Sequence, residues 1–240
     1  MIFYLYKKMK IKTNFSSEKT WDIIAESFDK TRRKPWIQCI DFINKLPKNH
    51  IVADIGCGNG RHLIPCAKHC GKIIGIDLSN KLLKIVQKNI KKNKIENSIL
   101  IHSNILNIPL KSESIDSALF IATLHNIKGR KNRIESLKEI HRILKNNGKV
   151  IISVWSRWQD NYRMQFFKKW FNLLKKNEFG DINIYWRQHG LNIPRFYHLY
   201  SKKEFLNDIK KNKFEILELK GVKFHSKINP DNYFAILRKK

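Results

Sequence analysis

Three closely spaced glycines follow a short apolar run in the first third of the chain. The run Ile51–Ile55 contains Asp54, and Gly56, Gly58 and Gly60 alternate with other residues directly after it. Close glycines let a backbone approach a ligand, since any side chain there would collide with it. A dinucleotide turn has the order G-x-G-x-x-G, which seats a pyrophosphate on a helix N-terminus. The tighter order D-x-G-x-G-x-G suits a ligand with a carboxylate for the backbone N–H groups and an amine for Asp54.

Two further polar residues stand where the next apolar runs end. Asp77 closes the run 72–76, and Asn104 follows the run 98–101. A carboxylate in the first position can accept hydrogen bonds from both hydroxyls of a ribose. An amide oxygen in the second can accept from an adenine amino group. The glycine turn alone is also compatible with a nucleotide-free α/β protein or with a dinucleotide-dependent dehydrogenase.

Together these features resemble the class I S-adenosylmethionine-dependent methyltransferases. The resemblance implies S-adenosylmethionine as the cofactor and no metal. Many members carry Asp at the position of Asn104, whose amide oxygen is still an acceptor. The residues that the resemblance assigns to the cofactor are Asp54, Gly56, Gly58, Gly60, Asp77 and Asn104.

A second set of motifs lies outside the glycine turn and narrows the family. It comprises Phe28–Trp36, Ile121–Asn126, Gly180–Trp186, Arg195–Tyr200 and Asp231–Tyr233. With these motifs the chain is similar, from about residue 21 onward, to the tRNA wobble-uridine carboxymethyl methyltransferases and their archaeal relatives. The run 195–200 is the most specific part. One departure is Asn126, where the family often has a second histidine.

The resemblance implies methyl transfer to the carboxylate of 5-carboxymethyluridine at the tRNA wobble position, which forms the methyl ester. That carboxylate is already an anionic nucleophile, so the reaction requires in-line placement and hydrogen-bond donors rather than a general base. The residues that the resemblance assigns to the acceptor are Arg32, His125, Arg195, Tyr197 and His198. Each also has a plainer interpretation: a surface charge for Arg32, a buried turn for Arg195 and His198, core packing for Tyr197, and a structural histidine for His125.

Two partners follow from the same resemblance. One is the tRNA anticodon loop, and the other is a small zinc-binding activator protein that forms a heterodimer with the catalytic subunit along a sheet element. The Ile- and Leu-rich stretch 99–108 is compatible with that interface and equally with core packing. Two other function classes stay open: a small-molecule methyltransferase of the same fold, and an RNA-binding module that has lost catalysis.

These residues must be positioned by elements that alternate between strands and helices. Strands are predicted at 51–55, 72–76, 98–101, 115–122 and 149–155, with a helix capped by Ser79 and another that ends near Asn147-Gly148. A helix from 205 to 209 and strands at 214–219 and 233–237 follow. The pattern predicts an α/β fold of the Rossmann-like class I methyltransferase type, with a mostly parallel, doubly wound sheet of seven strands.

The chain divides into an N-terminal helical segment, 1–48, and a methyltransferase domain, 49–240. Residues 156–195 interrupt the domain with an aromatic and basic insertion, which we expect to form a helical cap. Its lysines Lys168, Lys169, Lys175 and Lys176 are candidates for RNA contact, because single-stranded RNA is bound by cations placed among aromatic side chains.

Composition sets the remaining limits. The 240 residues carry 48 Lys and Arg against 20 Asp and Glu, and the net charge of +28 is spread along the whole chain. Such an excess favours a polyanionic partner, although a Lys-rich genome would also raise the charge. The four cysteines lack a metal-binding spacing and fit a reduced, cytoplasmic compartment. The absence of about 18 consecutive apolar residues predicts no membrane span.

Overall fold

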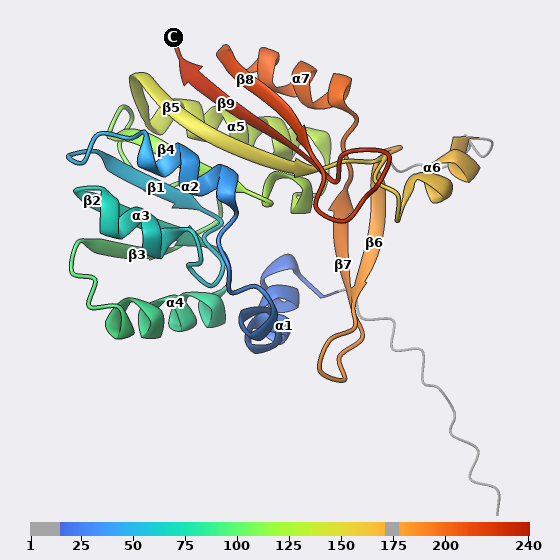
Figure 1. The fold of residues 1–240 in the computed structure, drawn as a ribbon, viewed down its shortest axis with the longest axis horizontal. Helices are drawn as coiled ribbons and strands as arrows, with labels where there is room; N and C mark the ends of the chain where they lie inside the picture. The colour runs from blue at the N-terminus through green and yellow to red at the C-terminus, as the bar shows by residue number, and fades with distance from the viewer. Residues whose placement is uncertain (1–14, 171–177) are drawn as a thin grey trace, which may run out of the picture.

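A seven-stranded sheet forms the centre of the molecule in the computed structural model, which describes residues 15–170 and 178–240 (Figure 1). The strand order is β3-β2-β1-β4-β5-β9-β8, in which β1 to β5 pair in parallel and β9 runs antiparallel to both of its neighbours. This arrangement confirms the predicted doubly wound sheet. Its strands are β1 (Ile51–Ile55), β2 (Lys72–Asp77), β3 (Ser98–His102), β4 (Ile115–Ile121), β5 (Leu144–Trp155), β8 (Phe214–Val222) and β9 (Asn232–Lys239).

Helices cover both faces of the sheet (Figure 1). One face packs against α2 (Ile37–Asn44), α3 (Leu63–His69) and α4 (Asn80–Lys92), which form one hydrophobic core with it. The other packs against α5 (Arg130–Ile143) and α7 (Lys202–Lys211) in a second core. Because both faces are covered, the central strands are mostly apolar and buried, as is usual for parallel sheets.

The helix α1 (Ser17–Thr31) lies beside α4 rather than on the sheet (Figure 1). Its Asp22 accepts hydrogen bonds from the Ser79 hydroxyl at 2.6 Å and from the Lys81 N–H at 3.0 Å. Ser79 in turn caps α4 by accepting from the Leu82 N–H, as its sequence position predicts. The start of α4, directly after β2, is therefore the anchoring point of α1.

The insertion differs from the expected helical cap. It contains one helix in the described part of the chain, α6 (Arg163–Trp170), followed by a two-stranded antiparallel sheet of β6 (Asp181–Trp186) and β7 (Ile193–His198). In β6, Ile184 and Trp186 are buried while the alternating residues Asn183 and Tyr185 are exposed, a period of two that is typical of a strand.

Of the lysines predicted to contact RNA, Lys168 is exposed, whereas Lys169 is engaged within the insertion. The ammonium group of Lys169 donates to the carbonyl oxygens of Phe179 at 2.9 Å and Asp181 at 3.0 Å, so it ties α6 to the strand pair. Lys175 and Lys176 lie outside the described residues.

One helix end was also predicted too late. α5 ends at Ile143, because Leu144 already pairs with Ile115 of β4. The Asn147-Gly148 turn lies instead inside an irregular stretch of β5, where Asn147 has a φ of 63°.

Cys39, Cys57, Cys66 and Cys70 are all buried and free of disulfides. Among the described residues, none of the helices combines the length and the apolar character that crossing a bilayer requires.

Candidate active site

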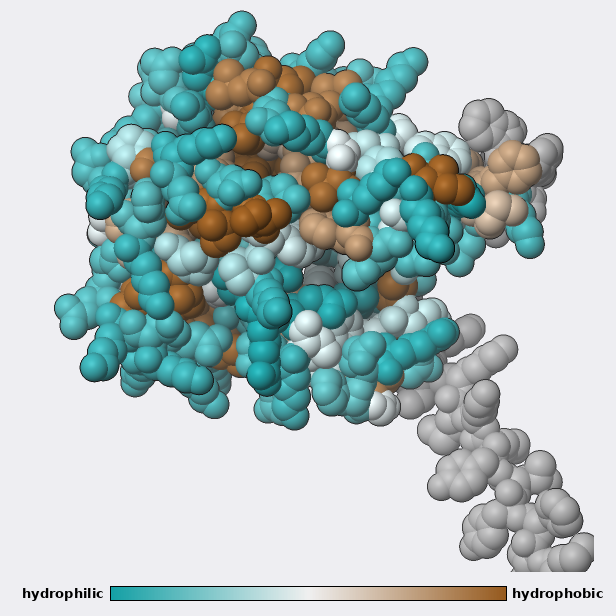
Figure 2. All heavy atoms as spheres, viewed as in Figure 1, coloured by the Kyte–Doolittle hydropathy of each residue, from teal (hydrophilic) through white to brown (hydrophobic). Residues whose placement is uncertain are grey.

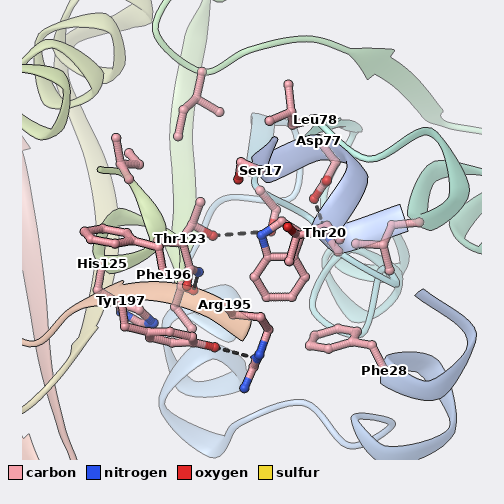
Figure 3. A pocket seen from close by; sticks show the side chains of 18 of the residues that line it. Ser17, Thr20, Phe28, Asp77, Leu78, Thr123, His125, Arg195, Phe196 and Tyr197 are labelled. Carbon is pink, nitrogen blue, oxygen red and sulfur yellow. Dashed lines mark hydrogen bonds between the residues drawn. The ribbon is translucent and has the colours of Figure 1, made fainter. Parts of the chain in front are cut away.

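A cavity of about 530 Å³ opens at the carboxyl ends of the parallel strands. Ligands of open α/β sheets bind at this edge, where the strand order reverses, here between β1 and β4. Its floor comes from the loops after β1, β2, β3 and β4, while α1 and β7 close it from the side. In Figure 3, Asp77 lies at one end of the cavity and His125, Arg195 and Tyr197 at the other.

The glycine turn and Asp77 build the first end. The N–H groups of Gly56 and Cys57 both donate to the Ile76 carbonyl oxygen, at 2.7 and 3.0 Å. The Gly58 N–H donates to one oxygen of Asp77 and the Ser79 N–H to the other, each at 2.8 Å. Each carboxylate oxygen keeps a further lone pair, so Asp77 can still accept from a ligand in the cavity.

The glycine at position 56 is required by its surroundings. Its φ is +71°, and a Cβ there would lie 2.3 Å from Oγ1 of Thr123, in the loop after β4. Both the left-handed backbone and the close approach therefore exclude a side chain. Gly58 also lines the cavity, where its φ is +58°.

Two predicted cofactor residues, Asp54 and Gly60, do not line the cavity. Gly60 has a φ of +80°, and a Cβ there would lie 3.0 Å from Val86, so this glycine serves the packing of α4. Asp54 is buried in β1, and its Oδ2 has no hydrogen-bond partner among the described residues. Burial, and then the charge of Asp77, raises the pKa of Asp54 to about 7.

The last predicted cofactor residue, Asn104, lines the cavity in the loop after β3. Its side-chain oxygen accepts from the Leu106 N–H at 3.0 Å, which fixes the amide orientation. The second lone pair of that oxygen is still available to an adenine amino group.

Aromatic rings build the opposite end of the cavity. His125 follows β4 in a short 3₁₀ helix, η1 (Leu124–Asn126), and its ring stacks on Tyr197 with centroids 5.2 Å apart and an angle of 21°. Trp155, at the end of β5, packs on the same Tyr197 at 5.0 Å. These rings come from three separate segments and form one wall, which suits a planar base.

The protonation state of His125 follows from its contacts. Its Nδ1 accepts a hydrogen bond from the Trp155 N–H at 3.1 Å, so the ring proton of the neutral form sits on Nε2. Burial, and then the charge of Arg195, lowers the pKa of His125 to about 3. At neutral pH the side chain is therefore an uncharged donor.

Two arginines complete this end. Arg195 is 7% exposed and donates from Nη1 to the Tyr197 hydroxyl at 2.5 Å, while its Nε has no partner within the described ranges. Arg32, just after α1, lines the same cavity from the more exposed side. Neither forms a salt bridge with a residue in the described part of the chain. Two cations without a carboxylate partner among the described residues, one of them buried, could bind an anion here.

The predicted acceptor residue His198 lies elsewhere. Its ring is 1% exposed and bonds Asp181 through Nδ1 and Glu204 through Nε2, both at 2.8 Å, away from the cavity lining. In a strand, residues two apart share a face and adjacent ones do not. Arg195 and Tyr197 of β7 therefore face the cavity, and His198 faces the opposite side. The structure thus places His198 away from the predicted acceptor site, and not in the buried turn of the plainer interpretation but at the end of β7 between two carboxylates.

Several cavity residues were missed from the sequence. Trp21 and Phe28 of α1 line the cavity, with ring centroids 5.7 Å apart. Their spacing of seven residues did place them on one face, but only the tertiary structure shows that this face covers a cavity.

The first end fits S-adenosylmethionine. The volume falls in the ordinary range for a ligand pocket, the glycine turn leaves backbone next to the space, and Asp77 offers carboxylate oxygens for a ribose. The buried Asp54, whose Oδ2 has no hydrogen-bond partner among the described residues, would supply negative charge for the ammonium group of the methionine moiety.

Comparisons with known proteins agree. A methyltransferase domain model matches residues 53–152. A crystal structure of SAM-dependent methyltransferases from Methanosarcina mazei superposes with a TM-score of 0.69 at 20% identity, over 83% of this chain and 96% of that one. Fold, turn and cavity therefore define a protein with a class I methyltransferase domain, and they indicate S-adenosylmethionine as its cofactor, as the sequence predicts.

Curated relatives point to a particular kind of methyltransferase. The chain is 34% identical over 142 residues to "tRNA (carboxymethyluridine(34)-5-O)-methyltransferase alkbh8" of Xenopus tropicalis, covering 59% of this chain and 21% of the relative. It is 33% identical over 146 residues to the tRNA (carboxymethyluridine(34)-5-O)-methyltransferase of Schizosaccharomyces pombe, covering 61% and 60%. The chain thus spans between about a fifth and three fifths of these two relatives. The resemblance stated from the sequence motifs is confirmed over about three fifths of this chain.

Proposed function

We propose that this protein transfers the methyl group of S-adenosylmethionine to the carboxylate of 5-carboxymethyluridine at the tRNA wobble position. The observation that carries the proposal is the pair of arginines Arg32 and Arg195, which have no carboxylate partner among the described residues and line the same cavity as Asp77. The relatives that match this chain are named for that reaction.

The chain's own residues then have distinct tasks. S-adenosylmethionine supplies an electrophilic methyl group when bound. Arg195 and Arg32 attract and orient the acceptor carboxylate, since a guanidinium fork matches its two oxygens. Tyr197 braces Arg195 through its hydroxyl and offers its ring to the base. A carboxylate has no proton to lose, so the site contributes placement and electrostatics rather than proton transfer.

His125 supports this division of roles. As a neutral donor at the aromatic wall, it can donate from Nε2 without adding a charge that would compete for the acceptor. Its low pKa makes it a poor base at neutral pH, in agreement with an acceptor that arrives ionised.

An RNA substrate accords with the surface. The face in Figure 2 is mostly hydrophilic, with separated hydrophobic patches, and the whole chain carries a charge of +28. A small carboxylic acid would require one local cation, whereas an RNA backbone is attracted by an extended positive surface.

We also propose that a small zinc-binding activator docks on the edge strand β3. This strand has a neighbour on one side only, and Ile99 on it is 42% exposed. An unpaired edge with an exposed apolar side chain is a template for strand addition by another protein.

The test uses labelled S-adenosylmethionine and two anticodon stem-loops that differ only at the wobble base, 5-carboxymethyluridine or uridine. Methyl esters release methanol in mild alkali, whereas ring or ribose methyl groups do not. We expect alkali-labile label on the modified stem-loop alone, with the activator present, and a drop of roughly a hundredfold or more for Arg195→Ala. Label on a small carboxylic acid but on neither RNA, or label stable to alkali, would contradict the proposal.

A further inference from the structure

A chain of hydrogen bonds joins α1 to the β6–β7 hairpin behind the arginine pair. The indole N–H of Trp186, at the end of β6, donates to the hydroxyl oxygen of Ser27 in α1 at 2.8 Å. The same oxygen lies 2.7 Å from Nδ1 of His189, in the hairpin turn. Because Trp186 can only donate, the proton of the Ser27 hydroxyl is free to bond His189. None of the three side chains lines the cavity.

Both arginines lie against the indole ring of Trp186 in cation–π contact. The guanidinium carbon of Arg195 lies 4.8 Å from its ring centroid, and that of Arg32 lies 5.3 Å from it. The ring is 2% exposed, and Phe28 of α1 packs against it at 5.9 Å. Two like charges repel, and the charge of Arg195, after burial, lowers the pKa of Arg32. The ring to which both are attracted therefore determines how they are spaced.

His189 occupies an unusual backbone conformation for this contact. Its φ is +52°, and the next residue, Gly190, has a φ of +73°. A side chain in the left-handed region is unfavourable unless its surroundings support it. Here the turn directs the imidazole of an otherwise exposed residue back onto Ser27.

We propose that Ser27, Trp186 and His189 are positioning residues for the acceptor carboxylate. Ser27 fixes the indole through its N–H, His189 fixes the Ser27 hydroxyl, and the indole spaces Arg32 and Arg195. This inference rests on the proposed function, because it assumes that the arginines bind a carboxylate.

The helix α1 also contacts the glycine turn, at the end of the cavity assigned to the cofactor. Asn59 of the glycine turn donates from Nδ2 to Asp29 of α1 at 3.0 Å and to the Arg32 carbonyl oxygen at 2.9 Å. Docking of α1 thus brings Arg32 to the cavity and engages Trp186 in one step. The anion site is complete only when α1 is seated on both halves.

The test measures binding of two nucleosides, 5-carboxymethyluridine and uridine, in the presence of S-adenosylhomocysteine. We expect the parent protein to prefer the carboxylate. Ser27→Ala and Trp186→Phe, which retains a ring but lacks the N–H, should reduce that preference about tenfold. The cofactor Kd should change by less than about twofold. Ser27→Thr keeps a hydroxyl and should restore the preference.

Two variants of the exposed turn keep the test valid if a core variant fails to fold. His189→Ala should also reduce the preference, whereas Gln188→Ala beside it should not. Equal weakening of both nucleosides, or an unchanged preference in His189→Ala and Ser27→Ala, would overturn the positioning role. A parent protein that does not prefer the carboxylate at all would instead contradict the proposed function, so the two failures are distinguishable.

Discussion

Asp54 and Asp77 stand at the ends of adjacent strands but differ in their environments. Asp77 faces the cavity and is supported by two backbone N–H groups. Asp54 lies behind the turn, where one oxygen has no partner among the described residues and burial raises its pKa to about 7. The first is arranged to accept hydrogen bonds. The second holds a charge that depends on pH.

This difference predicts a pH-dependent cofactor affinity. The ammonium group of the ligand's amino acid part favours the ionised carboxylate, so binding lowers the pKa of Asp54 and releases a proton when the pH lies near or below 7. Affinity for S-adenosylhomocysteine should therefore rise by up to about tenfold per pH unit as the pH approaches 7, and then level off. Calorimetry in two buffers of different ionisation enthalpy measures the proton release. In Asp54→Asn we expect neither the release nor the slope, and a parent protein without them would refute the role of Asp54.

His198 gives a second prediction at this scale. Burial disfavours its cation, but hydrogen bonds to Asp181 and Glu204 outweigh burial and raise its pKa. A raised pKa in the folded state contributes stability below the unfolded pKa of about 6.5, and this stability is lost as the pH rises through the folded value. His198→Gln should lower the free energy of unfolding by roughly 3 kcal/mol near pH 6, and by less near pH 9. Denaturant titrations measure this difference. If His198→Gln instead abolished catalysis without changing stability, the structural role would be contradicted and His198 would belong to the active site.

At the scale of elements, the two edges of the main sheet offer a matched comparison. Ile99 on β3 is 42% exposed and Leu217 on β8 is 41% exposed. If the activator adds to β3, Ile99→Lys should abolish the heterodimer, because burying an unpaired ammonium opposes association. Leu217→Lys should leave it intact. Co-expression followed by size-exclusion chromatography measures both, and equal effects of the two variants would contradict docking on β3.

The sequence predicted elements best where burial is continuous. The strands β1 and β2 are buried from their second residue onward, and their bounds agree with the prediction to within a residue. The β6–β7 pair was missed because its aromatic and basic composition also suits a helix, and its period of two spans only a few residues. That single error explains the wrong role predicted for His198. In a strand, unlike in a helix or turn, adjacent side chains point to opposite faces, so His198 lies on the face opposite to Arg195 and Tyr197.

Only the part of the candidate site that follows the buried strands could be predicted from the sequence. Motif spacing identified Gly56, Gly58 and Asp77, which meet the cavity because they follow the ends of parallel strands. Spacing alone does not show that Gly60 faces α4, or that Trp186 lies beneath the arginines. Those facts depend on contacts between segments far apart in the chain.

The whole molecule carries the charge that an RNA partner requires. A net charge of +28 predicts that binding of tRNA weakens steeply with salt, because each phosphate contact releases counterions. If about six phosphates are contacted, the affinity should fall roughly a thousandfold between about 50 and 200 mM salt. Fluorescence anisotropy of a labelled anticodon stem-loop measures the slope. A shallow slope, close to that of the free nucleoside, would favour a small-molecule substrate.

The most direct test of the proposed methyl transfer is a crystal structure of the protein with S-adenosylhomocysteine and 5-carboxymethyluridine. We expect the ribose of the cofactor product at Asp77 and the nucleoside carboxylate within hydrogen-bond distance of Arg195, with the base against Tyr197. The carboxylate should face the sulfur of the cofactor product, in line for transfer. A glycine turn without the cofactor product, or a carboxylate bound away from both arginines, would contradict the central claim.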